Sequence, residues 1–328
     1  MGNWGIVHDG LDVHTAGLNG ANRLFAARAC TAHHHFHLIH AVALRFLYRV
    51  GSGTGSLINT GNEVFIDEYT PAGVLQQSIP MPTSVVGANK RLIAGGTATS
   101  EGMLTRSTDG RLLIATGYDA APPVTSLTST ASATVNRVIA RIDAGGAVDT
   151  TTALTDAATG NNVRGAASSN GTDFWLTGGA GGIRHTTLGA TTSTQLSTTL
   201  TNLRQPAIFN GQLLVSTASG TAVRLGTVGS GLPVTSGQTI TNLPGISATT
   251  GNPHAFFFAD LDAGVTGLDT LYVADEGAAA LAKFSLVAGN WTSNGTVGVD
   301  TDDYRGLTAT VSGSNVTLFA TRKGGSGI

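Results

Sequence analysis

A hairpin pattern that occurs five times along the chain constrains its fold more than any other feature. Each copy starts with a small residue or glycine, continues with an apolar run and a polar turn, and ends near glycine after a second apolar run. The copies span residues 101–119, 163–181, 203–220, 253–277 and 304–324. The turns Asp109-Gly110, Asn170-Gly171 and Asn210-Gly211 tolerate positive φ and join antiparallel strands tightly. Each copy is therefore predicted to form a β-hairpin.

A second, weaker set of strand pairs lies between these hairpins. Each pair has an alternating strand, a turn that contains glycine and another strand, and the pairs span residues 63–79, 136–154, 182–200, 222–240 and 280–298. If the hairpins are inner strands A and B, the second set supplies outer strands C and D. Equivalent positions then recur at steps of 40 to 63 residues, which suits one four-stranded blade of a β-propeller per repeat.

The chain is therefore predicted to be all-β, a β-propeller of about six four-stranded blades. Residues 41–53 supply strand B of the first blade, which then lacks strand A. The last blade lacks strands C and D, so that ring closure is incomplete in the sequence given. Residues 1–40 are predicted to be a non-propeller N-terminal segment, disordered or helical, and residues 41–328 to be the propeller domain.

Two other architectures remain open at this point. A complete five-bladed ring, whose final hairpin serves the first blade, leaves residues 41–53 without a place. A β-helix is disfavoured because its repeats are much shorter.

Charge and hydropathy exclude several classes of partner. Only 12% of residues are charged, the net charge is -2, and the scattered Lys and Arg form no basic stripe, so we expect no nucleic-acid partner. We also expect no membrane insertion, because His40, Arg45 and Arg49 interrupt the longest apolar stretch. Cys30 is the single cysteine, which excludes an internal disulfide. The N-terminus has no signal-peptide pattern, and we expect a monomer.

Several strings in the repeats carry a family resemblance. They are RVGSGTGSL, VFIDEYTPAG, SEGMLTRSTDGRLLIATGYD, DTLYVADEG and YRGLTAT. From residue 47 to residue 324 the chain resembles a family of exported bacterial β-propeller proteins of unassigned function, with a six-bladed, NHL- or lactonase-like architecture. The resemblance implies an extracellular or cell-surface location. It also implies a C-terminal truncation, since family members continue to a further strand that closes the ring.

A histidine-rich segment lies outside the repeats. It contains His33, His34, His35, His37 and His40. Imidazoles at this density can bind zinc, copper or nickel, but no HExxH pattern or fixed carboxylate partner accompanies them. We interpret any metal binding here as adventitious.

The starts of the five A strands carry the main candidate site, which consists of Glu101, Arg164, Arg204, His254 and Arg305. Equivalent positions on successive inner strands encircle the propeller axis, so these side chains are predicted to form a mainly basic ring that binds a carboxylate or another small anion. The alternative is that they pair between neighbouring blades or bind exposed strand carbonyls, and so hold the ring together.

An acidic loop carries the candidate metal ligands Asp260, Asp262 and Asp269. Carboxylates at short spacing can hold Ca²⁺, which is the one candidate cofactor. The loop departs from the EF-hand pattern, because it has Gly264 where another oxygen ligand belongs and no properly spaced terminal Glu. A solvated acidic turn is the competing interpretation.

No catalytic motif is present: GxSxG, a P-loop and GxGxxG before a helix are all missing. The predicted function is a non-enzymatic binding or surface-interaction module for a small molecule, glycan or protein. The alternative is a lactonase-like six-bladed hydrolase or lyase with a metal or channel-centred site. Convergence of Glu101 with Asp119, Asp260 or Asp303 would favour the enzyme, and dispersal would count against it.

Overall fold

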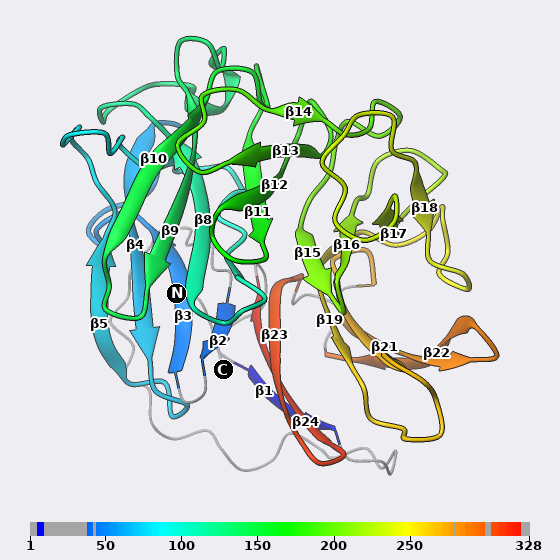
Figure 1. Ribbon diagram of the computed structural model, residues 1–328. Helices are drawn as coiled ribbons and strands as arrows, with labels where there is room; N and C mark the ends of the chain where they lie inside the picture. The colour runs from blue at the N-terminus through cyan, green and yellow to red at the C-terminus, as the bar shows by residue number, and fades with distance from the viewer. Residues whose placement is uncertain (1–4, 10–37, 42–43, 279, 299–302, 323–328) are drawn as a thin grey trace.

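The protein folds into antiparallel sheets arranged as blades around a central axis, as the computed structural model in Figure 1 shows. The structure describes residues 5–9, 38–41, 44–278, 280–298 and 303–322. The prediction of an all-β β-propeller is confirmed. Within these ranges the one helical element is a 3-10 turn at Leu127–Ser129, and no helix is long and apolar enough to cross a membrane.

The first two blades share a nine-stranded sheet, because the short strand β6 (Ile93–Gly95) pairs with both β4 and β8. From the axis outward, the first blade contains β2 (Leu38–Ala41), β3 (Leu44–Val50), β4 (Gly61–Tyr69) and β5 (Leu75–Pro80). The second contains β7 (Thr105–Arg106), β8 (Leu112–Tyr118), β9 (Arg137–Asp143) and β10 (Val148–Leu154).

The next three blades are separate four-stranded sheets. The third contains β11 (Val163–Ser168), β12 (Asp173–Gly178), β13 (Arg184–Thr187) and β14 (Thr194–Gln195). The fourth contains β15 (Pro206–Phe209), β16 (Gln212–Ser216), β17 (Leu225–Val228) and β18 (Ile240–Asn242). The fifth contains β19 (Pro253–Ala259), β20 (Thr270–Asp275), β21 (Ala280–Val287) and β22 (Asn290–Val297).

The sixth blade joins the two ends of the described chain. It contains β23 (Tyr304–Ser312), β24 (Asn315–Arg322) and β1 (Gly5–Asp9), and β1 pairs antiparallel with β24. The expected short last blade is present, with a third strand from the N-terminal side that the sequence did not predict. The expectation that the first blade lacks strand A is wrong, since β2 pairs with β3. Both β1 and β2 lie largely within the segment 1–40, whose remaining residues, including His33 to His37, are outside the described residues.

The apolar core is divided among the junctions between blades. Six buried clusters each contain side chains from two adjacent blades, and the last joins Phe319 of the sixth blade to Leu47 of the first. Strand β8 shows how one blade contributes to two clusters. Leu113 packs toward the first blade, whereas the next residue, Ile114, packs toward the third. Successive strand residues face opposite neighbours, so inner strands are apolar on both faces.

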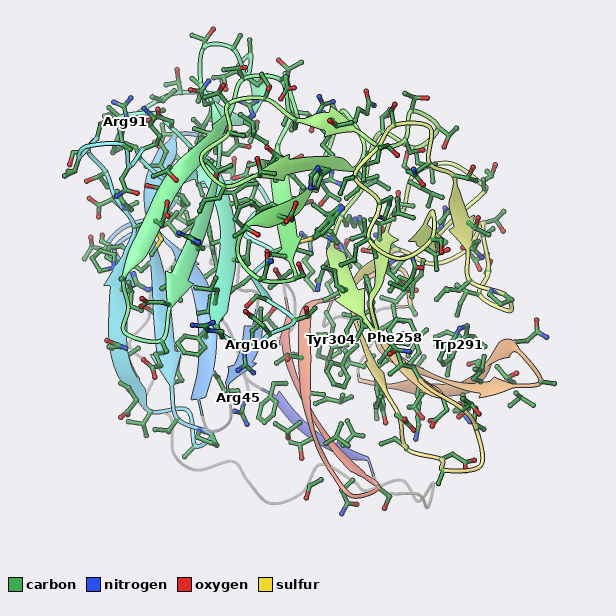
Figure 2. The ribbon with its side chains drawn as sticks, in the orientation of Figure 1. Arg45, Arg91, Arg106, Phe258, Trp291 and Tyr304 are labelled. Carbon is green, nitrogen blue, oxygen red and sulfur yellow. The ribbon has the colours of Figure 1, made fainter. Side chains whose placement is uncertain are left out.

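Two aromatic side chains illustrate the density of one junction. Phe258 on β19 and Trp291 on β22 lie with ring centroids 5.3 Å apart, edge to face (Figure 2). Edge-to-face packing brings the positive ring edge onto the negative ring face, which adds to the gain from burial. Strand β22, otherwise exposed, is anchored to its blade at Trp291.

The hairpin turns follow the predicted chemistry. Asn210 and Gly211 both have positive φ (46° and 72°) in the two-residue loop between β15 and β16. This is the combination that a type I′ turn needs, and its twist matches the twist of the strands that it joins. The A–B hairpin prediction is confirmed for this blade.

Candidate functional site

A backbone irregularity at the start of the A strands positions the candidate residues. On β11 the register shifts between Val163 and Gly165, and on β23 it shifts between Tyr304 and Gly306. Arg164 and Arg305 are the extra residues at these two bulges. A bulge re-aims the side chain of its extra residue and ends regular pairing, so both arginines leave the alternation that would place them between blades.

The fourth and fifth blades repeat this arrangement. The amide of Arg204 donates to the carbonyl of Ser216, whose own amide donates to the carbonyl of Gln205, so two residues oppose one. On β19 the register shifts around His254. The same end of the A strands therefore presents Arg164, Arg204, His254 and Arg305 from four successive blades (compare β11, β15, β19 and β23 in Figure 1).

Arg164 and Arg204 each bind a carbonyl of the following blade. Arg164 Nη1 donates to Leu203 O at 3.0 Å and to Asn202 Oδ1 at 2.6 Å. Arg204 Nη1 donates to the carbonyl oxygens of residues 252 and 253, both at 2.9 Å. The sequence analysis named such binding of strand carbonyls as the alternative to an anion site. These contacts occupy only some of the N–H groups of each guanidinium.

Other nitrogens of these two guanidinium groups are left over. Among the described residues, Arg164 Nη2 makes no hydrogen bond, and neither do Nε and Nη2 of Arg204. Both side chains are half-buried. Two arginines on adjacent blades therefore retain N–H donors beyond those that bridge the blades.

Glu276 links the fifth and sixth blades. His254 Nε2 lies 3.0 Å from Glu276 Oε2, and Arg305 Nη2 donates to Glu276 Oε1. Asn252 Nδ2 donates to the same Oε2 at 3.0 Å. The hydrogen bond from His254, together with those from Arg305, lowers the pKa of Glu276 well below its ordinary value. Glu276 is therefore a carboxylate throughout the physiological range.

His254 is fully buried and uncharged. Burial lowers its pKa to about 3, and the charges of Arg204 and Arg305 act in the same direction against the attraction of Glu276. Because Nε2 faces the Glu276 carboxylate, it carries the proton, and Nδ1 is a buried acceptor without a hydrogen-bond partner among the described residues.

Glu101 is held by the loop that precedes β7. Its side chain is 2% exposed. Oε2 accepts the Gly95 amide at 2.9 Å and Oε1 accepts the Tyr118 hydroxyl at 2.5 Å. The following residue, Gly102, has φ of +73°, and a Cβ there would lie 2.5 Å from the Tyr48 ring. Glycine at that position lets the turn approach Tyr48 and set the carboxyl inward.

The charges of these side chains act on one another. Burial lowers the pKa of Arg164 and of Arg204 to about 10. The charge of Arg305 contributes to both shifts, whereas Glu101 opposes the shift of Arg164. Guanidinium groups of three blades therefore share one electrostatic environment. We call Glu101, Arg164, Arg204, His254, Glu276 and Arg305 the axial cluster.

The candidate metal ligands lie at the other end of the propeller. Asp260 follows the end of β19, whereas His254 lies near its start, and a seven-residue strand separates them by about 20 Å. Asp269 Oδ2 accepts the amides of Leu261 and Asp262, at 2.8 and 2.7 Å, so it closes its own turn. No group of three or more His, Cys, Asp or Glu suited to a metal occurs in the described ranges.

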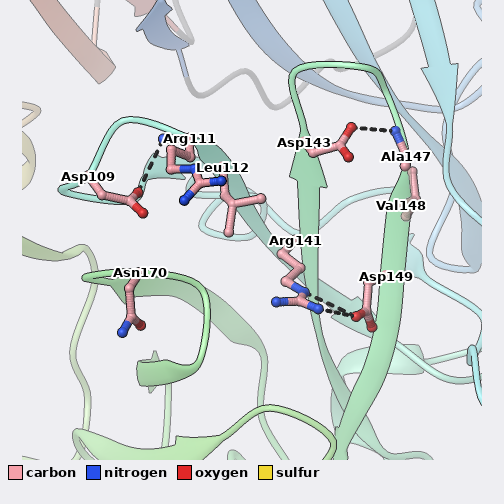
Figure 3. A pocket seen from close by; sticks show the side chains of 9 residues that line it. All are labelled: Asp109, Arg111, Leu112, Arg141, Asp143, Ala147, Val148, Asp149 and Asn170. Carbon is pink, nitrogen blue, oxygen red and sulfur yellow. Dashed lines mark hydrogen bonds and ion pairs between the residues drawn. The ribbon is translucent and has the colours of Figure 1, made fainter.

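A polar pocket of about 470 Å³ also opens at that opposite end, between the second and third blades. Figure 3 shows Arg141 on β9 paired with Asp149 on the neighbouring strand β10, and Asp143 Oδ1 accepting the Ala147 amide; both distances are 2.9 Å. Exposed Arg111 lies on its rim. The carboxylates of this pocket already have hydrogen-bond partners. The sequence pattern gave no indication of the pocket.

Three members of the site were missed from the sequence as site residues: Glu276, Asn252 and Tyr118. Glu276 follows β20, which separates it from Asp269 of the acidic loop. The signal that could have found it is the hairpin itself. Because strands A and B are antiparallel, a residue just after strand B lies beside the start of strand A.

No protein-family model matches the chain, and no curated protein matches it. Among solved structures, the chain is similar to the periplasmic gluconolactonase PpgL of Pseudomonas aeruginosa, with a TM-score of 0.50 and 14% identity over 84% of this chain and 75% of that chain. The soluble aldose sugar dehydrogenase of Escherichia coli gives a TM-score of 0.48 and 11% identity, over 81% and 93%. The likeness to the gluconolactonase supports the propeller fold alone.

Proposed function

We propose that the protein is a binding module that holds a small carboxylate at the axial cluster. The observation that carries this proposal is that Arg164 and Arg204, on adjacent blades, keep N–H donors beyond those bound to neighbouring carbonyls, while the charge of Arg305 on the sixth blade acts on both. Guanidinium donors at fixed geometry match a planar carboxylate in shape and charge.

The electrostatics of the axial cluster support an anion as the ligand. Burial is the main cause of the lowered pKa values of Arg164 and Arg204; the charge of Arg305 adds to both shifts, and the charge of Arg164 adds to that of Arg204. A bound anion relieves this repulsion and replaces water around half-buried cations. Because Glu276 already pairs with Arg305, the remaining donors of Arg164 and Arg204 are the favourable place for an anion.

The hydrolase alternative receives less support because its candidate carboxylates have other partners or lie at the opposite end of the propeller. Asp119 pairs with Arg91 at 2.7 Å, and Asp260 lies at the other end of the propeller from Glu101. Glu101 itself binds Gly95 and Tyr118. A metal-centred lactonase needs oxygen ligands that converge on one point.

A thermal-shift titration tests the proposal. Lactate is added to the wild type, and glucose serves as a neutral hydroxylated control. Because a ligand of the native state raises the melting temperature by mass action, lactate should raise it in proportion to the logarithm of its concentration. Arg204→Gln should abolish this shift, and Arg111→Gln, at the exposed pocket rim, should retain it. An equal response of both variants, or of glucose, would contradict an axial carboxylate site.

We also propose an extracellular or cell-surface location, in keeping with the resemblance to exported propeller proteins. The gluconolactonase to which the fold is similar is described as periplasmic. Fractionation of the source cells, with detection by a specific antibody, tests this location. Recovery with the cytoplasmic fraction alone would contradict it.

A further inference from the structure

We propose that carboxylate binding at the axial cluster is coupled to the uptake of a proton by Glu101. The inference rests on the proposed function and adds its regulation. The ligand's carboxylate binds to the arginines and brings one negative charge into the site. At the same time Glu101 accepts a proton from solvent and loses its own negative charge.

The geometry connects Glu101 to the strand that carries Arg164. Tyr118 donates its hydroxyl hydrogen to Glu101 Oε1 at 2.5 Å, and the phenol oxygen accepts the Val163 amide at 3.2 Å. Val163 directly precedes Arg164 on β11. One phenol therefore spans the distance between the Glu101 carboxyl and the backbone beside the guanidinium.

The charged and titratable groups around Glu101 come from four strands. They are Tyr48 on β3, Tyr118 on β8, Arg137 on β9 and Arg164 on β11. Burial raises the pKa of Glu101 to about 7, while the hydrogen bonds from Tyr118 and Gly95 and the charges of the two arginines lower it. Its ionisation therefore depends on opposing effects, one of which is the charge of Arg164.

Reciprocity then gives the direction of the coupling. Glu101 and Arg164 stabilise each other's charged forms. A carboxylate bound to Arg164 adds a negative charge near Glu101 and weakens that stabilisation, so it favours the protonated acid. By linkage, protonation of Glu101 strengthens carboxylate binding by the same factor.

The other ionisable members of the axial cluster do not compete for this role. His254 has a pKa of about 3 and is neutral from pH 6 to pH 8. The pKa of Glu276 is lowered, so that it stays ionised over the same range. Arg164 and Arg204, with pKa values of about 10, stay charged. Glu101 is thus the member expected to exchange a proton near neutrality.

Arg137 and Tyr118 act as positioning residues for this carboxyl. Arg137 is fully buried, donates to the carbonyls of Thr130 and Ala158 at 2.6 and 2.9 Å, and lies 4.9 Å from the centre of the Tyr118 ring. The loops hold the guanidinium, the guanidinium packs on the phenol, and the phenol orients Glu101. The acid therefore cannot swing toward solvent to escape the charge of a bound ligand.

Isothermal titration with lactate measures the coupling directly. Lactate stays ionised between pH 6 and pH 8, so any change in affinity belongs to the protein. From pH 6 to pH 8 the wild-type affinity should fall about three- to ten-fold, since a tenfold change corresponds to one pKa unit. At pH 7 the observed enthalpy should differ between bis-Tris and Tris buffers, which have different ionisation enthalpies, because protons are taken from the buffer.

Two variants assign the effect to Glu101. Glu101→Gln imitates the protonated acid and should bind lactate equally well at both pH values, without the buffer dependence. Glu63→Gln, an exposed carboxyl on β4, should behave like the wild type. The buffer comparison needs only the wild type, so it stands even if a variant fails to fold.

The outcomes separate this inference from the proposed function. Lactate binding that is independent of pH and of buffer would overturn the coupling and leave the axial carboxylate site intact. A Glu101→Gln variant with the pH dependence of the wild type would overturn the assignment to Glu101. If the wild type binds no lactate at either pH, the proposed function fails and the coupling fails with it.

Discussion

Burial acts in opposite directions on two residues of the axial cluster. Desolvation disfavours a charge, so it raises the pKa of the acid Glu101 to about 7 and lowers the pKa of the base His254 to about 3. Both groups are essentially without solvent contact. Near neutral pH the imidazole is neutral, whereas the carboxyl is divided between its two forms.

Glu101 should therefore make stability depend on pH. Its folded-state pKa is raised, so its contribution to the free energy of unfolding is present below about pH 4.5 and is lost as pH rises through 7. Glu101→Gln removes this loss. Urea unfolding should show the variant gaining about 2–3 kcal/mol on the wild type between pH 5 and pH 8.

A matched variant decides whether that gain comes from burial. Glu63→Gln changes an exposed carboxyl and should keep a constant offset from the wild type at both pH values. The explanation fails if the offset of Glu101→Gln is also constant.

For single residues, the sequence predicted which residue types start the A strands, but it did not predict the hydrogen-bond partners of these residues. Arg164, Arg204 and Arg305 could be placed because they occupy equivalent positions in a repeat. The contact between Glu276 and Arg305 could not, because it depends on how one blade is rotated against the next. That rotation is set by side-chain packing at each junction, which no local pattern records.

Among the elements, neighbouring blades are joined by hydroxyl groups at repeat-equivalent positions. Thr177 on β12 donates to the carbonyl of Arg204, and Ser216 on β16 donates to the carbonyl of His254 at 2.5 Å. Each hydroxyl sits on strand B and reaches the strand A start of the following blade. These contacts fix the backbone that carries the axial cluster.

Ser216→Ala should destabilise the protein by about 1–3 kcal/mol, because it leaves a buried carbonyl and the Gln205 amide without this hydroxyl. Ser230→Ala, in an exposed loop, is the control and should change the free energy of unfolding by less than about 0.5 kcal/mol. Urea unfolding compares the two variants. Equal stability would mean that the Ser216 contact contributes nothing to joining the blades.

The hairpins were predictable because their information is local. Asn210-Gly211 specifies its turn within two residues, and alternation of apolar residues specifies the flanking strands. The pairings of β1 with β24 and of β2 with β3 were not predicted. The first joins segments more than 300 residues apart in the sequence, and the second involves a strand of four residues.

On the scale of the whole molecule, the sixth blade closes the ring. Arg45 of β3 lies 3.8 Å from the ring centre of Phe319 on β24, and Leu47 packs against the same residue. Strand β1 covers the outer edge of β24. The first and last blades are therefore joined by contacts among β1, β3 and β24.

Removal of β1 should weaken this closure. A chain that starts at Gly10 leaves the edge of β24 unpaired, whereas a chain that starts at Gly5 keeps β1 and serves as the control. We expect the chain without β1 to lose about 3 kcal/mol of its free energy of unfolding. For a chain of this size this loss lowers the melting temperature by about 3–5 °C. Scanning calorimetry of the two chains measures the difference. Identical melting temperatures would mean that pairing with β1 does not stabilise the ring.

The axial carboxylate site is tested most directly by a crystal structure of the protein soaked with lactate after growth without carboxylates. The account predicts planar carboxylate density within hydrogen-bond distance of Arg204 and of Arg164 or Arg305. Lactate bound only elsewhere, for example beside Arg111 in the pocket at the opposite end, with no lactate at the axial cluster, would contradict it.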